Sequence, residues 1–275
     1  DIAWKLIGDM GKTAAELLLD IFKQTNGMKG RLAVQVNPTY YRNSEKMIAH
    51  GKKLFAIAPN ITIKLPATQA GIIAMEELTA QGVSVTATVC YSVAQAIACA
   101  EAMERGLARY GKPLQQYIAI MVGRLDDQLK RAMSSQGIIT DPGYLEWAGV
   151  ATFKKAYGIF EQRGYTPKLL AAAYRNHMQW SQFIGGGVVL SMPYKWWNRF
   201  NASDVEVIET MDEPVNKEVI DQLYDKFEDF RKAYDEDGMN PQDFEFFGAS
   251  VHTLKQFINS YNELLEMVRE RMLCR

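Results

Sequence analysis

The chain has 275 residues, 48% of them hydrophobic and 23% charged, with 31 basic and 32 acidic side chains that leave a formal net charge of −1. These values are ordinary for a soluble globular protein. The near-neutral balance argues against the broad basic face that nucleic-acid binding needs, and no apolar run approaches the ~20 residues of a membrane span. We therefore expect neither a nucleic-acid nor a membrane partner.

The cysteines predict a reducing compartment. Cys90, Cys99 and Cys274 are scattered, odd in number and without the spacing of a metal site. Reduced thiols of this kind are typical of the cytoplasm, so we expect a cytoplasmic protein without a metal. Residues 1–5 have neither an initiator methionine nor the pattern of a signal peptide. The chain is accordingly expected to begin after a segment that was removed or left out.

Six strand-like runs follow a first helical segment at residues 4–24. Each run is apolar, rich in β-branched residues and bounded by turn residues, and none alternates strictly between polar and apolar side chains. This pattern predicts strands that are buried on both faces. The six runs are residues 31–37, 60–65, 83–89, 117–122, 168–174 and 186–191.

Helical patterns separate the strands. Ser44 is the expected N-cap of a helix over residues 44–58, Thr68 precedes one at 69–80, and Ser92 precedes one at 95–107. The alternation of strand and helix predicts repeated βαβ units, which require a parallel sheet covered by helices. The predicted fold class is therefore α/β.

The composition changes after residue 191. An aromatic loop is predicted at residues 193–197, and two long amphipathic helices at 215–233 and 249–272. We expect residues 1–200 to form the α/β domain and residues 201–275 to form helices that pack on it. The alternative for these helices is a contact between subunits.

Lys64 is the most informative residue. It lies near the carboxyl end of the otherwise apolar strand at residues 60–65. Removal of an amine from water favours its neutral form, and a neutral lysine amine can attack a carbonyl group to form a Schiff base. An edge-strand lysine that reaches solvent is the other interpretation, and strand context alone leaves both open.

Four segments together resemble the transaldolase family. They are ITIKLPAT at residues 61–68, GVSVTATVCYSVAQ at 82–95, VGRLD at 122–126 and AAYRN at 172–176. They stand in the family's order and at suitable spacing, and the resemblance covers most of residues 28–192. In this family a strand ending in I-K-[VIL]-P-x-T carries the Schiff-base lysine.

The resemblance implies a (β/α)8 TIM barrel that transfers a dihydroxyacetone unit between sugar phosphates, in carbohydrate metabolism of the pentose phosphate pathway type. Lys64 would be the nucleophile, Thr88 would hold the catalytic water, and Thr86 would contact a substrate hydroxyl. Arg124 and Arg175 would bind the substrate phosphate, because both follow strand ends and guanidinium groups bind phosphate bidentately. No cofactor is implied, and we expect a homodimer.

Two positions depart from the family pattern and leave two alternatives open. Gln35 stands where transaldolases have a glutamate, and it can position a water but cannot act as a general base. Related fructose 6-phosphate aldolases have glutamine there, but a tyrosine where this chain has Met121. The alternatives are an aldolase-type lyase and a barrel that only binds a sugar phosphate.

Six predicted strands are too few for the eight-unit barrel that the motifs resemble. Nothing in residues 1–29 resembles the family's first two strands. A barrel without two strands exposes sheet edges and much of its interior. We therefore expect about 50–70 further residues, the length of two βα units.

Overall fold

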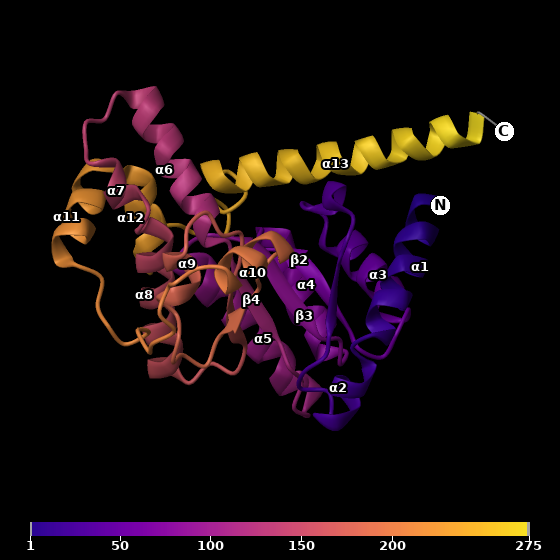
Figure 1. Cartoon of the computed structure of the whole chain (residues 1–275). Coiled ribbons are helices and arrows are strands. Elements are labelled where there is room, and N and C mark those ends of the chain that lie inside the picture. Colours follow the sequence, from indigo (N-terminus) through magenta and orange to yellow (C-terminus); the bar gives the residue numbers. More distant parts are fainter. Residues whose placement is uncertain (1, 274–275) are drawn as a thin grey trace.

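The computed structural model describes residues 2–273 and has an α/β architecture (Figure 1). Its strands are β1 (Leu32–Gln35), β2 (Ile61–Pro66), β3 (Val85–Cys90), β4 (Tyr117–Ile120), β5 (Lys168–Ala171) and β6 (Val189–Leu190). Its helices are α1 (Ile2–Glu16), α2 (Leu19–Gln24), η1 (Pro38–Tyr40), α3 (Ser44–Phe55), α4 (Gln69–Ala80), α5 (Val93–Tyr110), α6 (Val122–Gln136), α7 (Pro142–Leu145), α8 (Ala148–Arg163), α9 (Met178–Ser181), α10 (Tyr194–Asn201), α11 (Lys217–Lys226), α12 (Glu228–Tyr234) and α13 (Gly248–Leu273).

The six strands form one parallel sheet in sequence order, from β1 at one edge to β6 at the other. This confirms the predicted parallel α/β fold. Four strands lie within the predicted runs, while β2 and β3 each extend one residue beyond them, to Pro66 and Cys90. The sheet is curled like half of a barrel. Six strands, not eight, occur in residues 2–273, so β1 and β6 are both sheet edges in this part of the chain.

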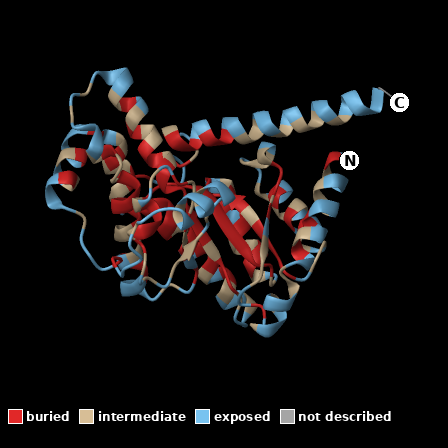
Figure 2. Cartoon of the chain, in the orientation of Figure 1, coloured by how far each residue is buried: buried red, intermediate tan, exposed pale blue. Residues whose placement is uncertain are grey.

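The central strands are buried on both faces, as their composition predicts. Ile61, Ile63 and Leu65 of β2 have no exposed surface, and every residue of β3 is buried. Figure 2 shows the central strands in red, within the buried centre of the molecule. The β-branched side chains suit this position because they pack well on a pleated surface between neighbouring strands.

Side-chain caps and one close backbone approach fix the helix starts. The hydroxyl oxygen of Thr68 accepts a hydrogen bond from the backbone N–H of Gly71, and Ser92 caps α5 in the same way. At Gly71 a Cβ atom would stand 1.8 Å from the carbonyl oxygen of Pro66, so only glycine lets α4 begin this close to β2. The predicted cap of α3 is wrong by one residue, because Asn43 is the residue that caps it.

Three helical predictions need correction. The first helical segment is divided into α1 and α2, and Leu17 between them is 82% exposed. The single helix predicted at residues 215–233 is two helices, because Phe227 adopts an extended conformation that buries its ring. The predicted aromatic loop forms α10, in which Trp196 and Phe200 lie one turn apart; Phe200 packs on Trp180, with the ring centroids 3.8 Å apart.

Helix α13 crosses the end of the sheet where the strands terminate (Figure 1). Near its start, Phe247 packs against Tyr91, which follows β3, with 6.3 Å between the ring centroids. Further along, the hydroxyl of Tyr261 accepts a hydrogen bond from the indole N–H of Trp4 at 2.9 Å. In residues 2–273, neither α13 nor any other helix is long and apolar enough to cross a membrane.

Candidate functional site

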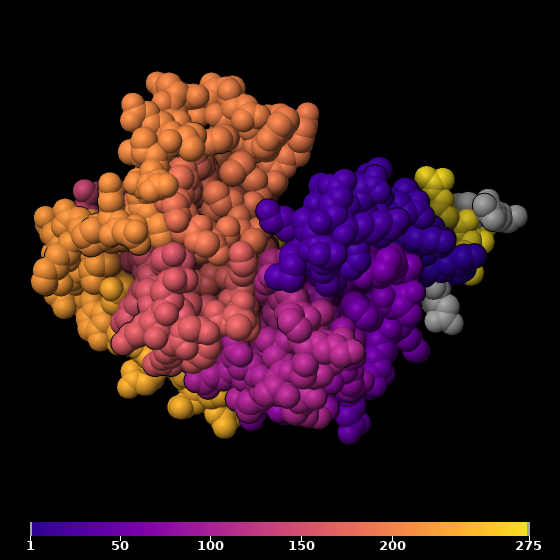
Figure 3. Space-filling view, turned by 90° about the horizontal axis from the view of Figure 1, so that it is seen from below, coloured from indigo at the N-terminus to yellow at the C-terminus, as the bar shows by residue number. Residues whose placement is uncertain are grey.

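The concave side of the curled sheet contains a cavity of about 700 Å³. Residues of all six strands line it, so it is the interior of the half-barrel. The space-filling view shows the hollow between the N-terminal helices, in indigo, and the segment around residues 190–210, in orange (Figure 3). Lys64, Thr62 and Thr86 are among its lining residues.

Strand register places Lys64 in the middle of one row of side chains. Gln35 of β1 is its neighbour on one side, and Thr86 of β3 on the other. The row continues to Tyr117 of β4 and Lys168 of β5. Paired residues of parallel strands point to the same face, so this row faces the cavity.

Burial changes the acid–base behaviour of Lys64. Desolvation lowers the pKa of its ammonium group from the ordinary value of 10.5. Among the described residues, its Nζ has neither a hydrogen-bond acceptor nor an ion-pair partner. Partial removal from water and the lack of a counter-charge both favour the neutral, nucleophilic amine of Lys64.

The two threonines of β3 have different surroundings. Thr86 lies beside Lys64, and its hydroxyl shares a hydrogen bond of 3.0 Å with that of Thr62. Thr88, one step along the same face, is fully buried and donates to the sulfur of Met121 at 3.8 Å. The sulfur is a weak acceptor, so the Thr88 hydroxyl loses little by bonding to a water.

The end of β3 has an unusual backbone conformation. The strand pairing with β4 shifts register between Ala87 and Cys90, and Val89 has φ of +54°. A β-branched residue in the left-handed region is strained, by roughly 1–3 kcal/mol. The surrounding structure must therefore hold this turn.

Gln95 is the side chain that holds it. Its amide nitrogen donates to the carbonyl oxygens of Val89, at 3.0 Å, and Ala67, at 3.1 Å. Its carbonyl oxygen accepts from the backbone N–H of Tyr91 at 2.9 Å and from the hydroxyl of Ser92 at 3.3 Å. Gln95 thus ties the end of the Lys64 strand to the end of the Thr88 strand.

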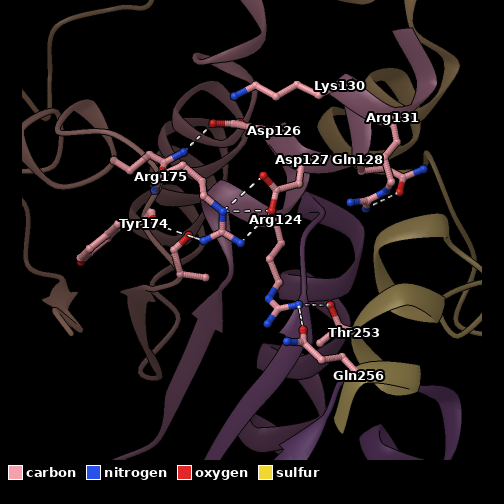
Figure 4. Close-up of polar contacts among 12 residues, drawn as sticks. Arg124, Asp126, Asp127, Gln128, Lys130, Arg131, Tyr174, Arg175, Thr253 and Gln256 are labelled. Carbon is pink, nitrogen blue, oxygen red and sulfur yellow. Dashed lines mark hydrogen bonds and ion pairs between the residues drawn. The ribbon is translucent and has the colours of Figure 1, made fainter. Parts of the chain in front are cut away.

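The two predicted phosphate-binding arginines lie at adjacent strand ends (Figure 4). A Cβ on Gly123 would come within 2.3 Å of the Ala173 carbonyl oxygen, so the segments that carry Arg124 and Arg175 are in close contact. Arg175 forms a bidentate ion pair with Asp127, with Nη2 2.7 Å from Oδ2.

Arg124 extends instead toward α13. Its Nη1 donates to Gln256 at 2.8 Å and to Thr253 at 3.2 Å, while its buried Nε has no hydrogen-bond partner among the described residues. The structure therefore brings the two arginines near each other but directs their guanidinium groups to different protein partners. Burial lowers the pKa of Arg124, and the charge of Arg175 acts in the same direction.

A buried carboxyl group is connected to the backbone of Arg175 through one intervening side chain. Asp126 accepts hydrogen bonds from the backbone N–H of Gly149 and from the side-chain amide of Gln179. Gln179 in turn accepts from the backbone N–H of Arg175. Burial is the main reason why the pKa of Asp126 is raised to about 7.

This shift predicts a pH dependence of stability. The folded chain binds the Asp126 proton more tightly than the unfolded chain does. The free energy of unfolding that this proton contributes is therefore present below about pH 4 and is lost as the pH rises to about 7. Asp126→Asn is expected to flatten the curve of unfolding free energy there, measured by urea denaturation at several pH values. Asp221→Asn, at an exposed carboxylate, serves as the control, and an unchanged slope in Asp126→Asn would contradict the assignment.

Sequence reasoning singled out side chains that the structure places on the cavity-facing row, at the end of β3 and at two adjacent strand ends, but missed the groups that contact them. The side chains singled out are Lys64, Gln35, Thr86, Thr88, Arg124 and Arg175. Gln95 is the last residue of the GVSVTATVCYSVAQ segment, and the sequence alone assigned it no role. Asp127 and the α13 residues Thr253 and Gln256 were not singled out. Asp127 directly follows the VGRLD segment and so lies on the first turns of the same helix as Arg124, but nothing in the sequence pairs it with Arg175.

A curled parallel sheet with a partly buried lysine on its concave face defines an α/β protein with a candidate amine nucleophile. The chain belongs to the transaldolase/fructose-6-phosphate aldolase family, whose model matches residues 1–268. The family assignment agrees with the resemblance drawn from the lysine and threonine motifs.

Several transaldolases are similar to this chain. A probable transaldolase of Caulobacter sp. (strain K31) is 28% identical over 190 residues, which cover 68% of this chain and 72% of that protein. A transaldolase of Glaesserella parasuis serovar 5 (strain SH0165) is 31% identical over 192 residues, or 67% and 55%. Transaldolase 2 of Streptomyces avermitilis is 29% identical over 170 residues, or 58% and 45%. The match thus spans about half the length of the latter two relatives.

Proposed function

We propose that this protein transfers a dihydroxyacetone unit from a ketose phosphate to an aldose phosphate through a Schiff base on Lys64. The observation that carries the proposal is the partly buried amine of Lys64, unpaired among the described residues, on the concave face of the sheet in a chain of this family. Its lowered pKa favours the neutral amine that must attack the substrate carbonyl.

The chemistry needs one nucleophile and a path for protons. The Lys64 amine adds to the ketose carbonyl, and loss of water gives the iminium ion. This ion accepts the electron pair of the cleaved carbon–carbon bond. The hydroxyl group next to that bond gives its proton to the water at Thr88, and the aldose leaves as its own carbonyl group forms. The resulting enamine attacks the carbonyl carbon of the acceptor, and hydrolysis of the new iminium ion restores the lysine.

We assign the neighbouring polar groups to water and hydroxyl binding. Thr88 would hold the water that is lost and regained, a role that its weak present acceptor supports. Gln35, beside Lys64 in the strand register, would orient this water without acting as a base. Thr86 would contact a substrate hydroxyl in place of Thr62.

Phosphate binding is assigned to Arg124 and Arg175. Each would exchange a present partner for phosphate oxygens: Arg175 its ion pair with Asp127, and Arg124 its contacts with α13. The short distance between their segments and the unpartnered Nε of Arg124 support a common anion.

Arg124→Gln and Arg175→Gln are each expected to raise KM for phosphorylated ketoses by about tenfold or more, because a charged hydrogen bond is lost. KM for unphosphorylated dihydroxyacetone should change little. Steady-state kinetics with both substrates measure the difference, with Arg163→Gln, at a distant exposed ion pair, as the matched control. Equal effects on the two substrates would assign the arginines a structural role instead.

Cleavage to free dihydroxyacetone is the second candidate activity, and Gln35 favours it because the related aldolases carry glutamine at that position. The two activities differ in their need for an acceptor. Fructose 6-phosphate should be consumed only slowly by a transaldolase until an aldose phosphate is added, whereas an aldolase releases dihydroxyacetone without one. No turnover under either condition would contradict both.

We further propose that the six strands belong to an eight-stranded barrel. The parallel order, the curl of the sheet and the two unpaired edges β1 and β6 support this. Two more parallel strands between those edges would satisfy their backbone groups. Residues 1–200 would then contribute to the barrel domain, and residues 201–275 would form its helical cover.

A further inference from the structure

Asp126 and Asp127 are consecutive carboxylates on α6, and both are connected to Arg175 (Figure 4). Asp127 pairs with the guanidinium group of Arg175, whereas Asp126 reaches the backbone N–H of Arg175 through the side chain of Gln179. Neither Asp126 nor Gln179 has exposed surface. A carboxyl group that the proposed reaction does not use is thus buried beside a proposed phosphate-binding residue.

The turn that carries Arg175 is strained and closely packed. Ala173 has a φ of +64°, in the left-handed region that residues with a Cβ atom rarely adopt. A Cβ atom on Gly123 would stand 2.3 Å from the Ala173 carbonyl oxygen and 2.7 Å from Cγ of Arg175, so the turn packs directly on the start of α6. Among the described residues, the backbone N–H of Arg175 donates only to Oε1 of Gln179. Gln179 is therefore the group that fixes the backbone of Arg175.

The ionised form of Asp126 determines which way the Gln179 amide points. Both oxygens of Asp126 accept hydrogen bonds, Oδ1 from the backbone N–H of Gly149 at 2.8 Å and Oδ2 from the side-chain amide of Gln179. A carboxylate is only an acceptor, so it holds the N–H groups of the amide on its own side and leaves Oε1 of Gln179 for Arg175. Donors and acceptors therefore match along the whole connection.

Protonation of Asp126 removes this match. The new O–H group is a donor, and the two groups that face the carboxyl oxygens are N–H donors as well. The O–H group gains an acceptor if the Gln179 amide turns over, but the N–H groups of the amide then face the backbone N–H of Arg175. Two facing donors form no hydrogen bond, so one end of the connection is broken in either orientation.

The surroundings of Asp126 place this protonation near neutral pH. Burial raises the pKa of Asp126 to about 7 against the hydrogen bonds that it accepts; the charge of Glu146 also raises it, and that of Lys130 lowers it. Its charged neighbours are Lys130 and Asp127 on α6, Glu146 at the end of α7, and Arg175. These four form two ion pairs, Lys130 with Glu146 and Arg175 with Asp127, so Asp126 has no charged partner among the described residues.

We propose that Asp126 and Gln179 are positioning residues for Arg175, and that the site of Arg124 and Arg175 binds its anion more tightly when Asp126 is ionised. This proposal rests on the proposed function, which assigns phosphate binding to the two arginines. The affinity should rise with pH across the range in which Asp126 loses its proton. Charge repulsion between Asp126 and the anion would act in the opposite direction, so the sign of the pH dependence distinguishes the two effects.

Calorimetric titration with sulfate tests this proposal. Sulfate is the probe because its charge is constant from about pH 5.5 to 8.5, whereas a phosphate group titrates within that range. Asp126→Asn imitates the protonated acid at every pH, because asparagine has the shape of aspartate and carries N–H donors. At the upper end of the range it should bind sulfate about threefold to tenfold more weakly than the native protein, the effect of one hydrogen bond. At the lower end the two affinities should converge.

Two comparisons isolate the contribution of Asp126. His177 and His252 lie near the arginines and also titrate in this range, but they are present in the native protein and in Asp126→Asn alike, so they cancel in the difference. Asp221→Asn makes the same chemical change at an exposed carboxylate of α11 and should leave the pH dependence unchanged.

The double variant Asp126→Asn/Gln179→Glu provides a rescue. A carboxylate at position 179 accepts both from the asparagine amide and from the backbone N–H of Arg175, while the asparagine oxygen accepts from Gly149. Every group regains a partner, so sulfate binding at the upper end of the pH range should return to the native affinity. A loss caused by general damage to the fold would persist in the double variant.

The outcomes separate this proposal from the assignment of the phosphate site. Sulfate binding that Arg175→Gln leaves unchanged contradicts the phosphate site, and the positioning role with it. A loss in Arg175→Gln without one in Asp126→Asn overturns the positioning role alone, as does an affinity that the double variant fails to restore. Weaker binding in Asp126→Asn, confined to the upper end of the pH range and restored in the double variant, supports it.

Discussion

Replacing Lys64 with methionine is expected to abolish turnover and, at the same time, to raise thermal stability at pH 7. Removal of a covalent nucleophile lowers kcat by roughly four orders of magnitude or more. Methionine has a similar length and no charge to desolvate, so it fits the same interior position. Activity and stability therefore respond in opposite directions, which loss of folding would not produce.

The stability effect has a defined pH dependence. Because burial lowers the pKa of Lys64 in the folded chain, the unfolded chain binds this proton more tightly. The native protein therefore gains stability relative to Lys64→Met as the pH rises from the lowered pKa toward 10.5. Thermal unfolding at a series of pH values measures the difference, with Lys112→Met as an exposed control. A melting temperature below that of the native protein at pH 7 would contradict the buried-amine account.

Gln95→Leu is expected to have the largest effect on stability. The change removes both the amide donor and the carbonyl acceptor and leaves the backbone groups of Ala67, Val89 and Tyr91 buried without partners. Each orphaned group costs about 1–3 kcal/mol, so the free energy of unfolding should fall by about 3 kcal/mol or more. At 2–4 °C per kcal/mol, the melting temperature should drop by roughly 6–12 °C.

Turnover should fall as well, because Gln95 holds the strand end that carries Thr88 and the turn at Val89. Calorimetry and steady-state kinetics on the same preparation measure both effects. Gln136→Leu, at an exposed residue at the end of α6, makes the same chemical change without buried partners. A loss of less than 0.5 kcal/mol in Gln95→Leu, equal to that control, would mean that other contacts hold the strained turn.

The sheet was predictable from sequence because its signals are local. Strand-length runs of β-branched residues, separated by capped helices, specify parallel βαβ units wherever both faces are buried. Thr68 and Ser92 mark two helix starts correctly, since a side-chain oxygen that accepts from a backbone N–H three residues later acts within one turn. The same reasoning misplaced the cap of α3, where Asn43 and Ser44 are adjacent and both residue types suit the position.

The C-terminal region was less predictable because its structure depends on tertiary contacts. Residues 215–233 have a continuous helical pattern, but burial of the Phe227 side chain divides them into two helices. Residues 193–197 are rich in aromatic side chains and follow a proline, which indicates a loop. They form the start of α10 because the indole of Trp196 donates to the carbonyl oxygen of Tyr174.

Within the site, residue types were more predictable than orientations. The position of Lys64 in an apolar strand was sufficient to single it out, and the structure adds its row of neighbours. The sequence also placed Arg124 and Arg175 at adjacent strand ends. It could not indicate that Asp127 holds the guanidinium group of Arg175. Nor could it indicate that two residues of α13, more than 120 positions from Arg124, hold that of Arg124. Such pairings depend on how distant segments pack.

Mass spectrometry after borohydride reduction in the presence of fructose 6-phosphate tests the central claim most directly. The reagent reduces an iminium ion to a stable amine, so a dihydroxyacetone fragment that is attached to the enzyme remains on its lysine. The account predicts a single reduced adduct, located on the peptide that contains Lys64 and absent from Lys64→Met. An adduct on another lysine, or none on the folded native protein, would contradict it.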